Sequence, residues 1–170
     1  MRRVTANRLI WVWLGALALM GTGCGFYLRG TRSMDFQLAK IFVQSQAADQ
    51  LAAEVKQELG YNGVTLAGGV GKADAVVVLS HERLDQRVLS VDPQTGKVRE
   101  LQLGYAVDLN VTERDGRSLI TPQTVSLVRD LIYDETAAIG TFEQVNLLHN
   151  EMRKDVVETV LLRLQTIKLK

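Results

Sequence analysis

The chain has 170 residues, of which 46% are hydrophobic, and its 20 basic and 19 acidic side chains give a formal net charge of +1. This composition suits one globular domain and lacks the basic excess expected of a nucleic-acid-binding protein. The sequence contains a single cysteine, which excludes a disulfide within the chain, so the fold must be stabilised by its core alone.

The first 24 residues have the pattern of a bacterial export signal. Three arginines precede or border an apolar run of 12 residues, 9–20, and the small residues 21–23 then lead into Cys24. The run is too short to span a hydrocarbon core, which takes about 20 residues. We therefore expect residues 1–23 to be a lipoprotein signal peptide and residues 24–170 to form a single α/β domain.

The position of Cys24 at the predicted cut site indicates that it accepts lipid. A plain secretory signal and an uncleaved anchor are the alternatives, since Gly21 departs from the aliphatic residue usual three places before a lipidated cysteine. Residues 24–170 carry 17 basic and 19 acidic side chains, which argues against a polybasic membrane-surface binder. Two acyl chains on Cys24 would supply stable anchoring instead. Gly25 follows, rather than the Asp of many inner-membrane lipoproteins, which favours delivery to the outer membrane.

The first part of the domain reads as strand, helix and strand. A short strand is expected at residues 40–44, and apolar residues at four-residue spacing predict a helix over 47–59. Gly60 is the expected C-terminal cap of that helix. A second short strand is expected at 61–66, ended by a glycine-rich loop at 68–72.

Two long hairpins and a helix follow. Residues 73–91 contain a valine run typical of a strand buried on both faces, and 92–96 form a turn with Pro and Gly. Residues 97–113 alternate strictly, with apolar side chains at Leu101, Leu103, Tyr105, Val107, Leu109 and Val111.

An Asp-Gly turn at 114–117 leads into a partner strand over 118–133, in which Pro122 indicates an edge or a bulge. The last helix is expected over 142–165. Its apolar stripe has spacings of three and four and consists of Val145, Leu148, Met152, Val156, Val160 and Leu164.

The lengths of these elements differ. The 17 residues 97–113 would extend roughly 55 Å at about 3.3 Å each. The last helix, at about 1.5 Å per residue, would cover only about 36 Å. We therefore expect the hairpin tips to project beyond the core or to lie against another protein, which favours a binding module over a catalytic pocket. The alternative is a bulge that breaks each strand into two ordinary ones.

Candidate catalytic and metal-binding patterns fail on inspection. The loop at 68–72 lacks the phosphate-binding spacing, because Leu66 stands where the first glycine is needed and Ala73 where Ser or Thr should hold magnesium. His81 and His149 have no ligand-type neighbours at metal spacing, so we expect surface or structural roles. No enzyme mechanism, metal or cofactor is predicted.

The charged flank of the last helix has an ordinary interpretation. Glu151, Asp155 and Glu158 lie beside Arg153 and Lys154, and this mixture predicts a solvated face.

Three segments resemble one family of proteins: residues 24–30 (CGFYLRG), 90–101 (SVDPQTGKVREL) and 122–135 (PQTVSLVRDLIYDE). Together with residues 151–153 on the last helix, they are similar in order and spacing to the LPS-assembly lipoproteins of the LptE family. The resemblance covers essentially the whole chain. It implies an α+β two-layer sandwich, with two helices packed on a mostly antiparallel mixed sheet of about four strands with long hairpins.

The resemblance also implies a function without catalysis. The protein would be a lipid-anchored outer-membrane lipoprotein on the periplasmic side. It would plug and help assemble the β-barrel of the LPS translocon and assist insertion of lipopolysaccharide into the outer leaflet. Its partners would be the barrel protein, lipopolysaccharide and, through acylated Cys24, the lipid of the outer membrane.

Lipopolysaccharide contact by basic residues near the sheet turns is implied by the same resemblance. Lys97 and Arg99 flank the turn at 92–96, and Arg87 lies on the preceding strand. Guanidinium groups suit phosphate because their fork makes paired, charged hydrogen bonds. Lys97 and Arg99 share the parity of Leu101, so we expect both on the face that is apolar further along. A solvated hairpin end is the alternative, and Thr141 stands where relatives often have lysine.

A second class of function stays open at this point. The chain would then be a periplasm-facing lipid-binding carrier or chaperone lipoprotein without a barrel partner, holding acyl chains in a cavity. The sequence has no Met- or Phe-rich groove that indicates such a cavity. A stable two-protein complex on purification favours the plug, whereas lipid copurified with an isolated monomer favours the carrier.

Overall fold

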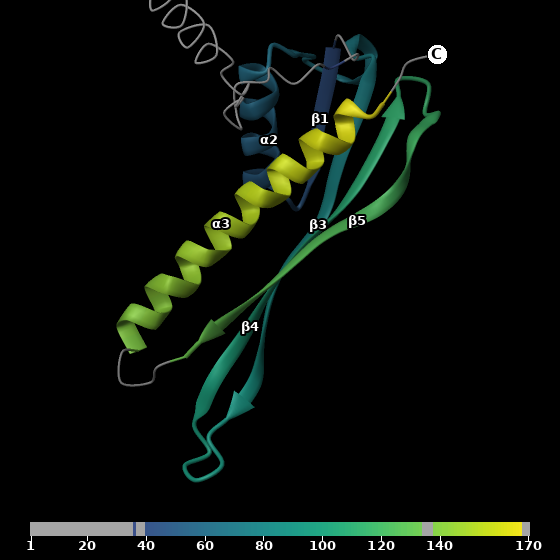
Figure 1. Ribbon diagram of the computed structural model, residues 1–170. Helices are drawn as coiled ribbons and strands as arrows, with labels where there is room; N and C mark the ends of the chain where they lie inside the picture. Colours follow the sequence, from purple (N-terminus) through teal and green to yellow (C-terminus); the bar gives the residue numbers. More distant parts are fainter. Residues whose placement is uncertain (1–35, 37–39, 134–137, 168–170) are drawn as a thin grey trace, which may run out of the picture. The chain divides into compact units, whose positions relative to one another are not determined.

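Two helices cover one face of a five-stranded sheet (Figure 1). The computed structural model describes residues 36, 40–133 and 138–167, with the side chains of the last helix described from residue 142. The predicted signal peptide and Cys24 lie outside the described residues. The elements are β1 (Lys40–Gln46), α2 (Asp49–Tyr61), β2 (Thr65–Leu66), a 3-10 turn η1 (Val70–Lys72), β3 (Ala75–Val91), β4 (Val98–Glu113), β5 (Ser118–Ile132) and α3 (Ala138–Gln165).

The sheet is mixed, with strand order β2-β1-β3-β4-β5. The central strand β3 pairs parallel to β1 and antiparallel to β4, and β5 pairs antiparallel to β4. The two-layer α+β architecture is thus confirmed. The expected count of about four strands is raised to five, because the two residues of β2 pair in parallel with the start of β1.

Helix α2 packs its predicted apolar face into the core, with Leu51, Val55 and Leu59 fully buried. The predicted end of this helix is wrong. The helix continues through Gly60 to Tyr61, and the side-chain amide of Asn62 donates to the carbonyl oxygen of Glu58 at 2.8 Å. A side-chain bond to the backbone therefore closes the last turn, and Gly60 is not needed as a cap.

The alternation of β4 is confirmed. Its apolar side chains at Leu101, Leu103, Tyr105, Val107, Leu109 and Val111 are buried against the helices. In β5 the expected irregularity at Pro122 is present, because the β4–β5 register shifts between the pairs Leu109–Gln123 and Val111–Ile120. One face of this sheet therefore supplies the core, and the other stays largely polar.

Strand β3 contains a bulge, yet the bulge does not break it. The register shifts between Ser80 and Arg83, and His81 adopts φ +51 within it. Before the bulge Leu79 pairs with buried Leu109, and after it Leu84 pairs with buried Tyr105. The extra residue therefore switches the helix-facing parity of β3 from odd to even. Parity taken from the sequence alone is therefore reversed from Arg83 to Val88, after which the register shifts again.

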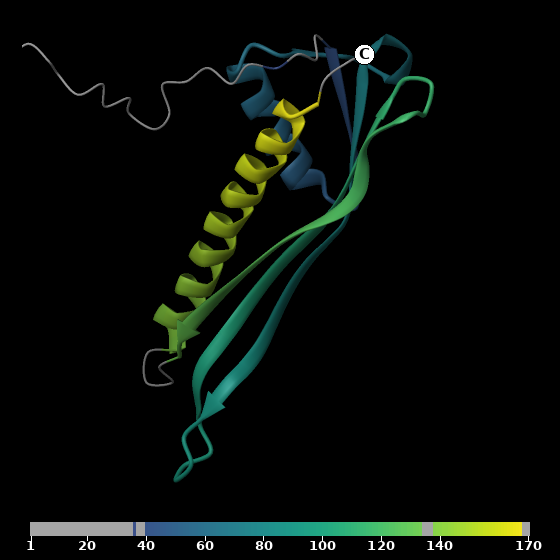
Figure 2. The ribbon, with the colours of Figure 1, turned by 45° about the vertical axis from the view of Figure 1, so that its right-hand side comes forward.

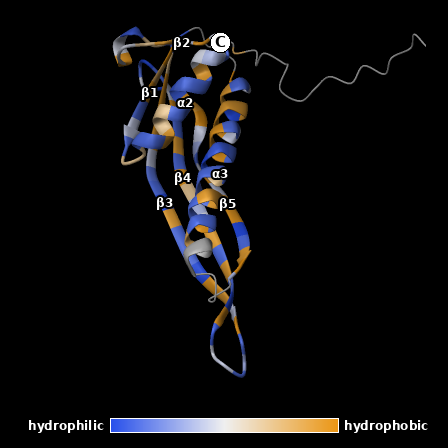
Figure 3. Ribbon diagram, turned by 90° about the vertical axis from the view of Figure 1, so that its left-hand side faces the viewer, coloured by the Kyte–Doolittle hydropathy of each residue, from blue (hydrophilic) through white to orange (hydrophobic). Residues whose placement is uncertain are grey.

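Helix α3 has 28 residues and begins four residues earlier than predicted. Its predicted stripe is confirmed, since Met152, Val156, Val160 and Leu164 are fully buried and Val145 and Leu148 are partly buried. Figure 3 shows the alternation of polar and apolar segments along the helix and the strands behind it. Within the described residues, no helix is both long and apolar enough to cross a membrane.

The β3–β4 hairpin projects, as its length predicted. Strand β5 ends at Ile132, opposite Glu100, so residues 91–98 have no β5 partner. Figures 1 and 2 show the hairpin continuing past the start of α3. We call residues 84–101, the half of this hairpin beyond the bulge, the distal hairpin.

Candidate functional site

The distal hairpin carries apolar side chains that neither α2 nor α3 buries. Leu84, Val88, Leu89 and Val91 are all exposed large hydrophobic residues, and Val88 is 51% exposed. In the proximal half of β3, by contrast, Val77 and Leu79 are fully buried. Exposed apolar residues that gather on one element indicate a contact surface rather than ordinary surface variation.

The turn at the tip is locked by its own sequence. The carboxylate of Asp92 accepts the backbone N–H groups of Gln94 and Thr95, each at 2.9 Å, and these bonds lower the pKa of Asp92. Gly96 takes φ +71, a conformation that favours glycine. The Arg99 guanidinium lies 3.9 Å from the Asp92 carboxylate. The conformation of the turn is therefore set mainly by Asp92 and Gly96.

A hollow of about 480 Å³ lies beside this turn. Its lining consists of Gln86, Val88, Gly96, Lys97, Val98, Leu101 and Tyr133. Lys97 therefore shares this lining with Leu101, whereas Arg99 is not among the lining residues. The register is irregular between Ser90 and Val91, where Arg99 is the extra residue of β4, so strict alternation does not hold at this end of the strand.

Arg87 lies on the other face of the sheet. It pairs with Gln102, which stands between the buried residues Leu101 and Leu103 and so faces away from the helices. The Gln102 amide donates to Asp130 at 2.8 Å on that face. The structure therefore does not bring Arg87, Lys97 and Arg99 together. Of these three basic residues, only Lys97 lines the hollow.

A cluster of charged side chains inside the domain escaped the sequence analysis. Arg153, predicted to lie on a solvated face, is only 8% exposed. Its guanidinium lies 3.6 Å from the Glu54 carboxylate and 3.8 Å from that of Glu82, and the hydroxyl of Tyr105 donates to Glu82. Burial, followed by this hydrogen bond, raises the pKa of Tyr105, so its hydroxyl stays protonated. We call Glu54, Glu82, Tyr105 and Arg153 the buried cluster, in which Glu54 is the most exposed member, at 32% of its side chain.

The buried cluster joins both layers of the fold, since its members come from α2, β3, β4 and α3. Glu82 reaches it because the bulge turns even-numbered residues of β3 toward the helices. In the sequence, the one indication that Arg153 is buried is its position directly after Met152 of the apolar stripe. That indication is weak, because an arginine next to a stripe usually extends into water.

The remaining charged flank of α3 faces β5. Arg129 pairs with Glu151, at 3.3 Å, and with Asp155. Glu158 is exposed, as predicted. The predicted solvated face is therefore correct for Glu158, whereas Arg129 of the sheet engages Glu151 and Asp155.

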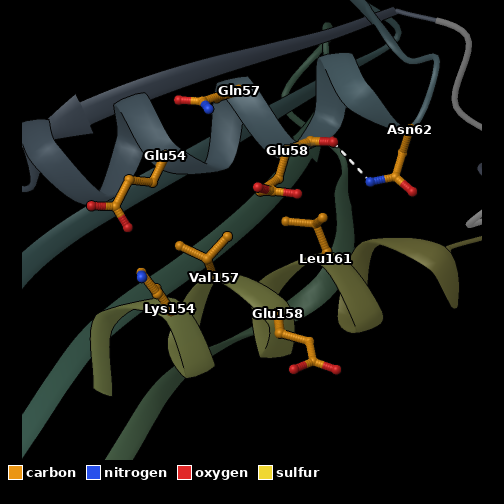
Figure 4. Close-up of a pocket in the computed structure, with 8 residues that line it drawn as sticks. All are labelled: Glu54, Gln57, Glu58, Asn62, Lys154, Val157, Glu158 and Leu161. Atoms are coloured by element: carbon orange, nitrogen blue, oxygen red, sulfur yellow. Dashed lines mark hydrogen bonds between the residues drawn. The ribbon is translucent and has the colours of Figure 1, made fainter. Parts of the chain in front are cut away.

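A groove of about 430 Å³ lies between the two helices (Figure 4). Val157 and Leu161 form its apolar part, while Glu54, Gln57, Glu58, Asn62, Lys154 and Glu158 surround them. Three carboxylates, those of Glu54, Glu58 and Glu158, therefore border the apolar part of the groove.

The two histidines have the structural or surface roles that the sequence predicted. The side chain of His81 is exposed, and its imidazole Nδ1 lies 3.1 Å from the Asp108 carboxylate. His149 is partly buried, and burial, followed by the charge of Arg153, lowers its pKa. Among the described residues, no group of His, Cys, Asp and Glu could hold a metal ion.

Comparison with known proteins gives consistent similarities. Residues 38–164 match the family described as "LptE: Lipopolysaccharide-assembly". A protein of Photorhabdus laumondii named LPS-assembly lipoprotein LptE is 28% identical over 162 residues, which cover 95% of this chain and 87% of that protein. A protein of the same name from Yersinia pestis is 27% identical over 165 residues, which cover 95% and 77%.

Solved structures share the fold. An uncharacterized lipoprotein B from Nitrosomonas europaea aligns with a TM-score of 0.68 at 23% identity, covering 81% of this chain and 88% of that one. The rare lipoprotein B from Shewanella oneidensis aligns with a TM-score of 0.64 at 25% identity, covering 73% and 92%. Both are helix-on-sheet proteins of the architecture described above.

Proposed function

This chain belongs to the LptE family of lipopolysaccharide-assembly lipoproteins, and from that premise we propose that it acts as a lipid-anchored plug. In this proposal Cys24 holds the mature chain, residues 24–170, at the periplasmic side of the outer membrane. The domain occupies the lumen of the β-barrel that translocates lipopolysaccharide, and it assists insertion of lipopolysaccharide into the outer leaflet without catalysing a reaction.

The observation that carries the proposal is the distal hairpin. It extends beyond α3 and exposes Leu84, Val88 and Val91, which would need cover in a stable assembly. A narrow projection suits insertion into a lumen better than a flat surface does. Purification of the chain from detergent-solubilised outer membranes tests it. A barrel protein should copurify in a stable complex, and recovery of a monomer carrying only lipid would refute the plug.

Replacing Cys24 with alanine should remove the protein from the outer membrane. Without the thiol there is no acceptor for acyl chains, so the variant should be either uncleaved or soluble in the periplasm. The measurement is membrane fractionation in cells that lack the barrel partner, so that only the lipid can hold the protein. A Cys24→Ala variant that still fractionates with the outer membrane there would show that lipidation is not the anchor.

Contact with lipopolysaccharide is proposed at the hairpin end. Lys97 lines the hollow with Val88 and Leu101, which places one cation beside apolar side chains. That combination suits a phosphorylated, acylated ligand. Arg99 lies in β4, outside the lining of the hollow, and its guanidinium is 3.9 Å from the Asp92 carboxylate. Arg87 would reach a ligand only from the other face. We therefore assign the main charge contribution to Lys97 and a second contribution to Arg99 at the same end of the hairpin.

The double change Lys97→Glu with Arg99→Glu should weaken lipopolysaccharide binding by about tenfold or more at low salt. Each charged hydrogen bond contributes about 1.5–3 kcal/mol, and added salt should reduce the difference because the site is open to water. Folding should persist, since the turn is held by Asp92 and Gly96. Binding is measured by titration at two ionic strengths, together with recovery of the barrel partner.

The matched control is Lys72→Glu with Arg114→Glu, which reverses two exposed cations at the opposite end of the sheet. It should leave lipopolysaccharide binding unchanged. Unchanged binding in the Lys97 and Arg99 variant, combined with loss of the barrel partner, would mean that these residues face the barrel wall.

A further inference from the structure

The two edges of the sheet differ in what they offer. At one edge β2 has only two residues, so it provides almost no template for another strand. At the other edge β5 has 15 residues and a single neighbouring strand, β4 (Figure 1). Residues 123–132 of β5 pair with β4 without any register shift. This run of ten residues is long enough to hold a further strand.

The backbone groups that face the open edge can be identified. The Tyr133 N–H donates to the Arg99 carbonyl oxygen at 2.8 Å, so Tyr133 is directed at β4. In an antiparallel ladder the direction alternates from residue to residue. Odd-numbered Leu127 and Arg129 therefore bond to β4, whereas even-numbered Ser126 and Val128 direct their N–H and C=O groups away from it.

Few of the features that usually protect an edge lie within this run, the main one being Arg129 on the helix face. Pro122 stands just before it, at the register shift. The charged side chains within the run are engaged elsewhere: Arg129 pairs with Glu151 and Asp155, and Asp130 accepts from Gln102. No lysine or proline occurs in residues 123–132. Native proteins normally guard an edge of this length with such residues or with a bulge.

The side chains along the edge define what would pair with it. On the face away from the helices, Val128 is 60% and Ile132 is 78% exposed. On the helix face, Arg129 is outnumbered by the carboxylates of Glu151 and Asp155, whose side chains remain about half exposed. A strand laid here would place apolar residues beside Val128. It would tolerate lysine, and not a carboxylate, near Glu151.

The geometry points to β5 as a docking edge that takes an extended strand from another polypeptide, with apolar residues on the outer face and neutral or cationic residues toward α3. Such a strand would satisfy the outward backbone groups of residues 124–132 and cover both exposed apolar side chains. This inference concerns a surface other than the distal hairpin. Its test uses neither lipopolysaccharide nor the barrel, so its failure is distinguishable from failure of the plug.

The test uses the full lipidated protein in detergent micelles and a nine-residue peptide that alternates valine with lysine and threonine. Amide hydrogen exchange is measured residue by residue. In the free protein the amides of Leu127 and Arg129 should exchange slowly and those of Ser126 and Val128 rapidly. The peptide should slow the even-numbered set by about tenfold or more. A peptide methylated at its bonding amides should have no effect.

Val128→Pro is the decisive variant, because it removes an outward N–H and leaves the bonds to β4 in place. It should weaken peptide binding by about tenfold or more, whereas Val128→Ala should change it by less than about threefold. Retained protection at Leu127 and Arg129 shows that β5 is intact. If the protection of Leu127 and Arg129 is lost in Val128→Pro, the test is repeated with Ser126→Pro, which changes another outward position.

Three results would overturn the inference. Val128→Pro could bind the peptide as well as Val128→Ala does, or the methylated peptide could bind as well as its parent. The amides of Ser126 and Val128 could also be protected from hydrogen exchange in the free protein. If that protection rises with protein concentration, the edge pairs with a second copy of this chain rather than with a different partner.

Discussion

Val156→Asp is expected to destabilise the domain by several kcal/mol. Val156 is fully buried in the middle of the apolar stripe of α3, packed against the sheet. An aspartate there would be buried without an ion-pair partner, and burial of an unpaired carboxylate is among the most costly single changes. Urea unfolding of the purified domain measures the effect as a lowered midpoint.

The matched control is Glu158→Ala, two residues along the same helix on an exposed position. It should change the free energy of unfolding by less than about 0.5 kcal/mol. Equal midpoints for Val156→Asp and Glu158→Ala would contradict the assigned orientation of α3.

Arg153→Met should cost about 3 kcal/mol, even though methionine fills much of the same space. Removing the guanidinium leaves the Glu82 carboxylate, which is mostly buried, without its cation, and the Tyr105 hydroxyl cannot neutralise that charge. Breaking one side of a buried ion pair is more destabilising than replacing both. Thermal unfolding at constant pH measures the loss.

Two comparisons separate charge from packing in the buried cluster. Arg129→Met removes a guanidinium whose side chain is 38% exposed, so it should cost less than about 1 kcal/mol. Adding Glu82→Gln to Arg153→Met should recover part of the loss, since the second change removes the orphaned charge. If the two arginine variants are equally stable, the buried cluster contributes packing alone.

The order of the helices and long strands, and the apolar faces of α3 and β4, follow from the sequence alone. The stripe of α3 and the alternation of β4 were both predicted correctly, because periodicity is a local property that burial then selects. The length of the β3–β4 hairpin also predicted its projection past α3. The resemblance carried by short segments identified the family.

The direction and burial of other side chains depend on tertiary structure, because one extra residue in a strand or one distant partner changed them. The bulge at His81 reversed parity in β3 and delivered Glu82 to the core, and the irregularity at Arg99 separated it from Lys97. Arg153 became a buried residue because Glu54 and Glu82, far away in sequence, supply its counter-charges. Such outcomes depend on pairing between strands and helices, and local sequence patterns contain no information about which partner will be present.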